Sequence, residues 1–386
     1  MQRRQFLQWA TQTTLSFAAL PNAHASPDPH APRLLVLLLR GGMDGLTAVP
    51  PLGDPHYDGL RPTLNIRKAL PLNNGFGLHP SLSSLHDLWL NNQLAIVHCT
   101  GFAYRGRSHF EGQDVMQSGL DRPYTSRTGW LGRAMQAAQI PGGVSISIPM
   151  PLLLRGNEQT TTQYPNWMPS APLTVAQALP DLWANDDHLK PHAQVLQHRA
   201  MNQARQALKG QAYTEARSLP ELARLAGEAM SREDGPRVGL IDFNGGFDTH
   251  ANQGAEQGTH ADQLNRIHQV VHHFQASMGT HWRNALVLTL TEFGRTAAEN
   301  GTTGTDHGWG TCCFLAGGLV RQSQVYADWR GLQRSQLHEE RDLPATIDVN
   351  AVHARVIERV FELNSRTIQS EVLTYRDHAH LKGLLI

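Results

Sequence analysis

Residues 34–39 read LLVLLL, and residues 40–45, RGGMDG, stop this apolar run abruptly. An uninterrupted apolar run of strand length is typical of a β-strand that is buried on both faces, as in a parallel sheet covered by helices. A second run of this kind, LAIVHC at residues 94–99, ends at Thr100 and Gly101. The two runs predict buried strands of a parallel sheet.

Further strand and helix patterns alternate along the rest of the chain. The strand patterns lie at residues 144–148, 237–243, 285–291 and 312–318, and the helix patterns lie at residues 81–92, 262–278 and 349–361. This alternation predicts a single α/β domain over residues 26–386, a three-layer α/β/α sandwich around a largely parallel sheet. Residues 155–235 interrupt the alternation with mostly helical patterns, so we expect an inserted helical cap or lobe there.

The first 25 residues have the pattern of an export signal. Arg3 and Arg4 precede a modest apolar stretch, and Ala23-His24-Ala25 offers a small-residue cleavage pattern. The apolar stretch is far shorter than the roughly 20 residues that span a bilayer. We therefore expect a signal of the twin-arginine type, recognised by the twin-arginine export machinery. The mature protein is then expected in the periplasm or secreted, without a transmembrane segment.

Composition excludes some classes of protein and points toward metal chemistry. Lys+Arg 33 and Asp+Glu 33 leave no formal net charge, which argues against a basic nucleic-acid-binding scaffold. The chain has 21 histidines, and histidine is the commonest metal ligand in proteins. Cys99, Cys312 and Cys313 could form one disulfide in an oxidising compartment or remain buried thiols within strands. We favour buried thiols.

Polar side chains with metal-binding chemistry stand next to several predicted strands. They are Asp44, Asp248, His250, Glu292, Asp306 and His307. In an open parallel sheet, ligands bind beyond the carboxyl ends of the strands, so we expect these side chains to meet in one pocket. Carboxylate oxygens together with imidazole nitrogens suit Zn²⁺ or Mn²⁺ better than Ca²⁺. The pattern predicts one or two divalent metal ions.

Five motifs, taken in order, give the chain a resemblance to a known family. They are RGGMDGL at residues 40–46, RSHF at 107–110 with QD at 113–114, GFDTH at 246–250, EFGRT at 292–296 and TDHG at 305–308. The set resembles the bacterial domain-of-unknown-function family 1501, a group of twin-arginine-exported proteins. That family is similar to the alkaline-phosphatase-like superfamily, which includes phosphatases, sulfatases and cofactor-independent phosphomutases. The resemblance implies a parallel-sheet sandwich and commonly a two-metal site.

The resemblance also implies roles for individual residues. Asp44 corresponds to the aspartate after the first strand of the superfamily, and Asp248 and His250 correspond to ligands of the second metal. His307 corresponds to the last histidine ligand, with Asp306 beside it. At the strand that normally ends in an Asp-His pair, this chain continues with Glu292, so a carboxylate is kept and a histidine is lost.

The nucleophile of the superfamily lies at the start of a helix, and Ser108 is the candidate here. A serine in that position feels the helix dipole and could be activated by a metal ion. The alternative is that Ser108 only caps the helix, with Glu111 as its capping-box partner three residues later. His109 could be a metal ligand or a base. The arginines that could receive an anionic ester are Arg105, Arg107 and Arg295.

These observations predict an exported metal-dependent hydrolase of phosphate, sulfate or related anionic esters. Ser108, His109 and Arg295 are its catalytic candidates. Its substrate would be a small anionic ester or a surface-linked ligand. The alternative is a relative of the same superfamily that has lost hydrolysis and binds a metal, a ligand or a partner in the periplasm or in cell-surface assembly. The missing Asp-His pair favours this alternative.

Overall fold

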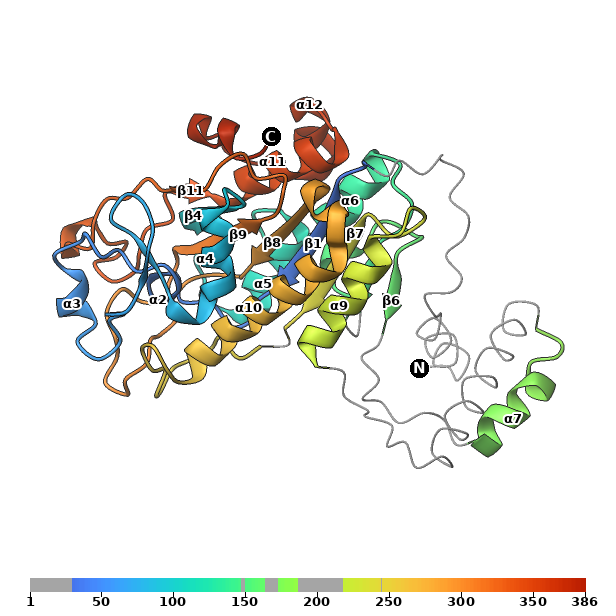
Figure 1. Cartoon of the computed structure of the whole chain (residues 1–386), viewed down its shortest axis with the longest axis horizontal. Coiled ribbons are helices and arrows are strands. Elements are labelled where there is room, and N and C mark those ends of the chain that lie inside the picture. The colour runs from blue at the N-terminus through green and yellow to red at the C-terminus, as the bar shows by residue number, and fades with distance from the viewer. Residues whose placement is uncertain (1–29, 147–149, 164–172, 187–217, 244) are drawn as a thin grey trace.

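The computed structural model describes residues 30–146, 150–163, 173–186, 218–243 and 245–386. One large sheet forms its centre (Figure 1). Its strands are β1 (Arg33–Leu38), β4 (Leu94–Gly101), β5 (Val144–Ile146), β6 (Thr161–Gln163), β7 (Val238–Asp242), β8 (Ala285–Leu290), β9 (Thr311–Ala316), β10 (Gln324–Tyr326) and β11 (Ile347–Asp348). Their order is β10-β4-β9-β8-β1-β7-β5-β6, and β11 also pairs with β4.

The strands run parallel to one another with one exception. β9 is antiparallel to both of its neighbours, β4 and β8. The two apolar runs at residues 34–39 and 94–99 form β1 and β4, and β8 and β9 separate them in the sheet. The prediction of a largely parallel sheet is therefore confirmed.

Helices cover both faces of the sheet, which gives the predicted three layers (Figure 1). The helices α4 (Ser83–Leu90), α9 (Leu219–Met230) and α10 (Thr259–Met278) share one apolar core, and α5 (His109–Ser118), α6 (Trp130–Ala137) and α11 (Val349–Phe361) share the other. The strand β1 shows how the sheet divides these cores. Leu35 and Leu37 join the first, whereas Leu34, Val36 and Leu38 join the second, because successive side chains of a strand point to opposite faces.

Shorter elements complete the described part of the chain. They are α2 (Gly45–Ala48), α3 (Tyr57–Leu60), α12 (Ser365–Thr367) and the antiparallel pair β2 (Leu70–Pro71) and β3 (Gly77–Leu78). Local signals set several helix boundaries. The Ser218 side chain caps the first turn of α9, and Asp348 caps α11. Gly119 ends α5 with a φ of 69°, a left-handed conformation that glycine adopts without a steric penalty.

The predicted insertion at residues 155–235 is shorter than expected at both ends. At one end, β6 extends the sheet by pairing parallel with β5. At the other end, α9 packs into the same core as α10. Between them, α7 (Leu173–Leu182) is described, whereas residues 164–172 and 187–217 lie outside the described residues. A cap in that interval stays a prediction, as does the export signal at residues 1–25, which also lies outside the described residues.

The three cysteines are buried free thiols, as favoured above. Cys99 lies in β4, and Cys312 and Cys313 lie in β9. In the ranges that the structure describes, no helix is long and apolar enough to cross a membrane.

Three buried histidines should make the fold sensitive to acid. Burial lowers the pKa of His98 and His260 to about 4 and that of His353 to about 3. In the unfolded chain a histidine takes up its proton near pH 6.5, so below that pH the unfolded chain binds more protons than the folded chain. The free energy of unfolding should therefore fall as the pH decreases from about 6.5 to about 4.

The variant His260→Phe should weaken this pH dependence. Both ring nitrogens of His260 lack a hydrogen-bond partner among the described residues, so a phenyl ring leaves no new polar group unpaired. The variant removes one of three comparable contributions, so its denaturation midpoint should fall less than that of the wild type on acidification. Urea titrations at several pH values between about 7 and 4, with EDTA present, measure this. Identical pH profiles for the two proteins would contradict it.

Candidate metal site

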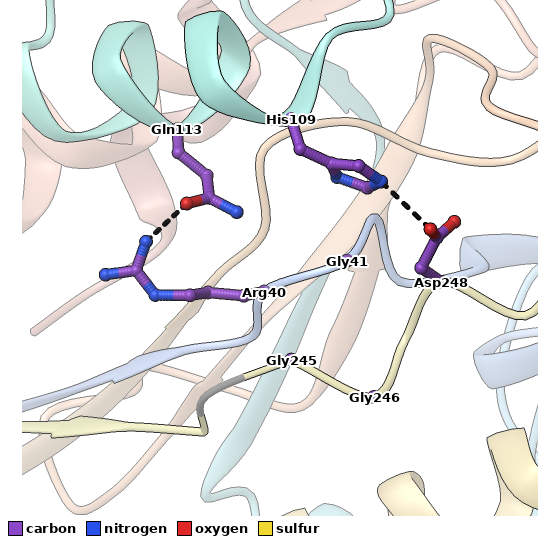
Figure 2. A pocket seen from close by; sticks show the side chains of 7 residues that line it. All are labelled: Arg40, Gly41, His109, Gln113, Gly245, Gly246 and Asp248. Carbon is purple, nitrogen blue, oxygen red and sulfur yellow. Dashed lines mark hydrogen bonds and ion pairs between the residues drawn. The ribbon is translucent and has the colours of Figure 1, made fainter.

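Three histidine rings converge on the carboxylate of Asp248. The Nε2 atoms of His250 and His307 lie 2.9 Å and 3.0 Å from Asp248 Oδ1. His109 Nε2 lies 3.3 Å from Asp248 Oδ2. Figure 2 marks this contact with a dashed line. The ligand atoms of His109, Asp248 and His307 all lie within 4.8 Å of one another. The structure thus brings together four residues that come from α5, from the loop after β7 and from the loop before β9.

The other nitrogen of each ring, Nδ1, contacts an oxygen atom. These oxygens are Glu292 Oε1 at 2.8 Å from His109, Asp306 Oδ1 at 3.1 Å from His250, and the Arg107 carbonyl at 2.8 Å from His307. Because carboxylate and carbonyl oxygens accept hydrogen bonds, each Nδ1 is the donor. A neutral ring then carries its lone pair on Nε2, directed toward Asp248. Metal-binding histidines are held in this way in proteins.

Two contacts test whether the site fits a cation. His250 Nε2 and His307 Nε2 lie 3.0 Å apart, so their two lone pairs would repel unless a proton or a metal ion separates them. His109 Nε2 is buried, and its contact with Asp248 lacks hydrogen-bond geometry, so it has no hydrogen-bond partner in the described structure. Three imidazole nitrogens around one carboxylate fit a divalent ion such as Zn²⁺.

Arg295 lies beneath Asp248 and is fully buried. It donates to Asp248 Oδ1 at 2.7 Å and to the side chain and carbonyl of Thr305. Burial alone would raise the pKa of Asp248, but the hydrogen bond and charge of Arg295 lower it to about 2. In the described structure the Arg295 guanidinium is buried and holds Asp248, and its predicted role in receiving a substrate anion stays a prediction.

Glu292 supports His109 and is not placed as a metal ligand. It is 2% exposed, and its Oε1 accepts hydrogen bonds from Gly41 N at 2.9 Å, from Gln113 Nε2 at 3.0 Å and from His109. Burial raises the pKa of Glu292, but the hydrogen bonds from His109 and Gln113 outweigh it, so the pKa is lowered. The same contact with Glu292 raises the pKa of His109. In the described structure Glu292 orients His109, and its predicted role as a metal ligand stays a prediction.

Asp306 has a comparable place beside His250. Its Oδ1 accepts the His250 Nδ1–H and also a hydrogen bond from Asn300 Nδ2 at 3.1 Å. Asp306 therefore contacts the ring on the side that faces away from Asp248. In this position Asp306 fixes the His250 ring, and its predicted role as a metal ligand stays a prediction.

Asp44 lies inside the protein, where other described residues donate hydrogen bonds to its oxygens, and its predicted role as a metal ligand stays a prediction. It is 1% exposed and caps α2, accepting the Leu46 N–H at 3.1 Å. Its Oδ2 accepts hydrogen bonds from buried Arg61, from Thr47 Oγ1 at 2.7 Å and from Gln253 Nε2 at 2.7 Å. Burial would raise the pKa of Asp44, but the charge and hydrogen bond of Arg61 hold it well below its usual range. Asp44 is the carboxylate of a buried ion pair.

Ser108 precedes α5, as predicted, but the expected capping box does not form. The Ser108 side chain makes no capping hydrogen bond, and the Glu111 carboxylate instead accepts the Tyr104 hydroxyl at 2.6 Å. No hydrogen bond joins Ser108 to the three histidines or to Asp248 in the described ranges. The next residue, His109, is the one directed at the cluster. A nucleophilic role for Ser108 stays a prediction.

A pocket of about 320 Å³ opens beside His109 and Asp248. Its other lining residues are Arg40, Gly41, Gln113, Gly245 and Gly246 (Figure 2). A Cβ atom on Gly41 would lie 2.6 Å from Asp248 N, so glycine is required where this turn approaches the cluster. Sequence reasoning missed Arg40 and Gln113 as site residues. Both residues stand within the quoted motifs, and this could have indicated them. Arg40 directly follows the first strand run, and Gln113 lies one helical turn after His109.

Glu292→Gln should weaken metal binding without abolishing it. The amide would present a neutral group to His109 Nδ1, and loss of such a supporting carboxylate typically costs about 10- to 100-fold in metal affinity. Competition with a chromophoric Zn²⁺ chelator measures the affinity, with Glu256→Gln as a surface control. An affinity equal to that of the wild type would refute the supporting role. Complete loss of metal would instead indicate that Glu292 is itself a ligand.

The family model described as Protein of unknown function (DUF1501) matches residues 31–373. The chain belongs to this family. The family resemblance predicted from the five motifs is thereby confirmed. No curated protein matches the sequence of this family 1501 member.

Several solved structures are similar to this family 1501 chain in fold. Murine ectonucleotide pyrophosphatase/phosphodiesterase 5 is 10% identical, with 92% of this chain and 100% of that chain covered and a TM-score of 0.44. The PsFucS1 sulfatase from Pseudoalteromonas sp. is 11% identical, with 100% and 76% covered and a TM-score of 0.39. The C-terminal periplasmic domain of EcEptC from Escherichia coli, in complex with Zn, is 13% identical, with 74% and 72% covered and a TM-score of 0.33. These likenesses are distant, and what those proteins bind or cleave is their own property.

Proposed function

We propose that this chain is an exported, metal-dependent hydrolase of phosphate, sulfate or related anionic esters. The observation that supports this most is the common orientation of the His109, His250 and His307 rings around Asp248. Each ring is tied at Nδ1 to an oxygen and directs Nε2 at one carboxylate. Such an arrangement gains from a bound cation, because with neutral rings three lone pairs and a carboxylate would face one another.

The ligands of the ion would be Asp248, His109, His250 and His307. This nitrogen and oxygen set suits Zn²⁺ or Mn²⁺, and the ligand atoms of His109, Asp248 and His307, which lie within 4.8 Å of one another, suit a single ion. When bound, the ion would polarise the ester and stabilise the charge that develops on it. Three residues around the site support its ligands. Glu292 and Asp306 fix the orientations of the His109 and His250 rings, and Arg295 keeps Asp248 ionised.

A second candidate is a metal-binding relative without turnover, which holds a ligand or a partner in the periplasm or in cell-surface assembly. The observation that favours it is that the arginines near the site already have carboxylate partners. Arg40 pairs with Asp242, and Arg107 pairs with Glu339 and Asp342. The Arg105 guanidinium instead lies 4.4 Å above the Trp309 ring.

Metal analysis combined with an ester screen tests both candidates. Protein purified without chelator is assayed for bound metals and for hydrolysis of 4-nitrophenyl phosphate, bis(4-nitrophenyl) phosphate and 4-nitrophenyl sulfate. His307→Ala is compared with His272→Ala, a control on the exposed side of α10. About one equivalent of metal and turnover that only His307→Ala abolishes would support the hydrolase. Metal without turnover would support the second candidate, and absence of metal from the wild type would count against both.

A further inference from the structure

The pocket beside the metal site has an unusual lining. Beyond His109 and Asp248, it consists of two polar side chains, Arg40 and Gln113, and of three glycines. In Figure 2 the Arg40 and Gln113 side chains meet on one side of the pocket, and His109 and Asp248 meet on the other. Among the described residues no apolar side chain lines it, and carbon atoms of the polar side chains and glycines supply the rest of the exposed surface beside the polar groups.

The charge of Arg40 is already balanced. Its Nε atom lies 2.9 Å from both oxygens of Asp242, and its Nη2 lies 2.7 Å from Oδ2. The Asp242 side chain is only 5% exposed, so the pair is a tight, largely desolvated one. The pair carries no net charge, so a second anionic group would gain little attraction from this side of the pocket.

Arg40 and Gln113 have more N–H groups than the acceptors that they contact. Arg40 uses Nη1 toward Gln113 Oε1 and Nη2 toward Asp242, which leaves each of these nitrogens with an N–H that has no partner among the described residues. Gln113 Nε2 donates one hydrogen to Glu292 and keeps the other. The pocket therefore offers several N–H groups in a neutral setting, and these match acceptor oxygens of an uncharged group.

The glycine loop leaves room for such a group. Gly245 has a φ of 91°, and a Cβ built on it would meet no atom within 4 Å. Among the described residues, that side of the pocket is therefore open.

We propose that this pocket binds an uncharged, hydroxyl-bearing group, a polyol or a sugar, that is attached to the anion at the metal site. The placement of the anion rests on the proposed function, whereas the pocket itself is argued from Arg40, Asp242 and Gln113. Arg40 and Gln113 are then specificity-determining residues, and the substrate class is narrowed to esters of polyols or sugars.

Three non-hydrolysable phosphonates of equal length test the proposal. They are 3,4-dihydroxybutylphosphonate, butylphosphonate and 3-carboxypropylphosphonate, which differ only in a hydroxylated, an apolar or an anionic end. Calorimetric titration into Zn²⁺-loaded protein gives their dissociation constants. The dihydroxy compound should bind about tenfold tighter than the other two, as two added hydrogen bonds allow. Equal or tighter binding of the butyl or carboxypropyl compound would overturn the proposal.

Two variants tie the preference to the pocket. Arg40→Lys keeps the ion pair with Asp242 but loses the donor fork, so the preference for the dihydroxy compound should disappear. Asp242→Asn leaves the Arg40 charge unbalanced, so the carboxypropyl compound should gain affinity relative to the wild type. Arg224→Lys, in an exposed pair with Glu228, is the matched control and should change neither. Unchanged preferences in both pocket variants would also overturn the proposal.

A separate readout distinguishes failure of this proposal from failure of the proposed function. If no phosphonate binds, the anion site is refuted, and the pocket is tested alone with sorbitol and glucose. Shifts of the Gly41, Gly245 and Gly246 amide signals in NMR spectra, lost in Arg40→Lys, would support the polyol pocket without the hydrolase. The absence of such shifts would overturn the pocket as well.

Discussion

The Asp248→Asn variant is expected to lose its bound metal, with a fall in affinity of more than about a hundredfold, because a lost ligand should cost more than a lost supporting group. Asp248 is the one carboxylate that all three histidine Nε2 atoms approach. Asparagine keeps the size of the side chain and an oxygen that can accept from Arg295. The variant therefore removes the negative charge while preserving the buried hydrogen bond, and any ester hydrolysis should fall together with the metal content.

Elemental analysis after dialysis and competition with a Zn²⁺ chelator measure this loss. The matched control is Asp262→Asn, which changes an exposed carboxylate in the first turn of α10 and should retain the metal. A folded Asp248→Asn protein that still binds an equivalent of metal as tightly as the wild type would show that the three histidines do not form the site.

The Asp44→Ala variant should have the largest effect on stability. It leaves Arg61, which is fully buried, without the carboxylate that it contacts. Breaking a buried ion pair by removing one partner typically lowers the free energy of unfolding by about 3–5 kcal/mol. The fraction that remains folded should bind as much metal as the wild type. In the described structure no hydrogen bond joins Asp44 to His109, His250, His307 or Asp248.

Urea unfolding at neutral pH and metal analysis of the folded fraction check the two parts of this prediction. Asp58→Ala, an exposed carboxylate in α3, is the control and should unfold like the wild type. Replacing both partners, as Asp44→Leu with Arg61→Met, should recover part of the lost stability, since no charge is then left unpaired. Loss of metal from folded Asp44→Ala would indicate that Asp44 is a metal ligand.

Much of the fold could be predicted from the sequence because buried strands and amphipathic helices have distinct apolar patterns. The apolar run at residues 34–39 became the fully buried β1, and the helix pattern at residues 349–361 became α11 with the same bounds. The direction of a strand leaves no comparable pattern. The sequence of the antiparallel strand β9 has the same apolar pattern as its parallel neighbours. Its direction is known only from its pairing with β4 and β8.

The position of the site could be predicted from the sequence better than the role of each residue in it. Asp248, His250 and His307 were expected together and lie together. Whether a carboxylate binds an ion or supports a histidine depends on which ring nitrogen it contacts, and no spacing in the sequence encodes that contact. The contacts of Glu292 with His109 and of Asp306 with His250 could therefore not be predicted. In the structure Asp44 caps the short helix that follows it, which is a common role of an aspartate in a glycine-rich turn.

The chain leaves the sheet at the end of β8 and re-enters it at the start of β9, and both points lie on the same rim because β9 is reversed. The segment that joins them, residues 291–310, carries His307 together with Glu292 and Arg295, which hold His109 and Asp248 in place. One ligand candidate and two supporting residues of the metal site therefore lie on one contiguous segment of the chain. A relative that exchanged this stretch would acquire a ligand and its supports in one event, with the strand pairings on either side left intact.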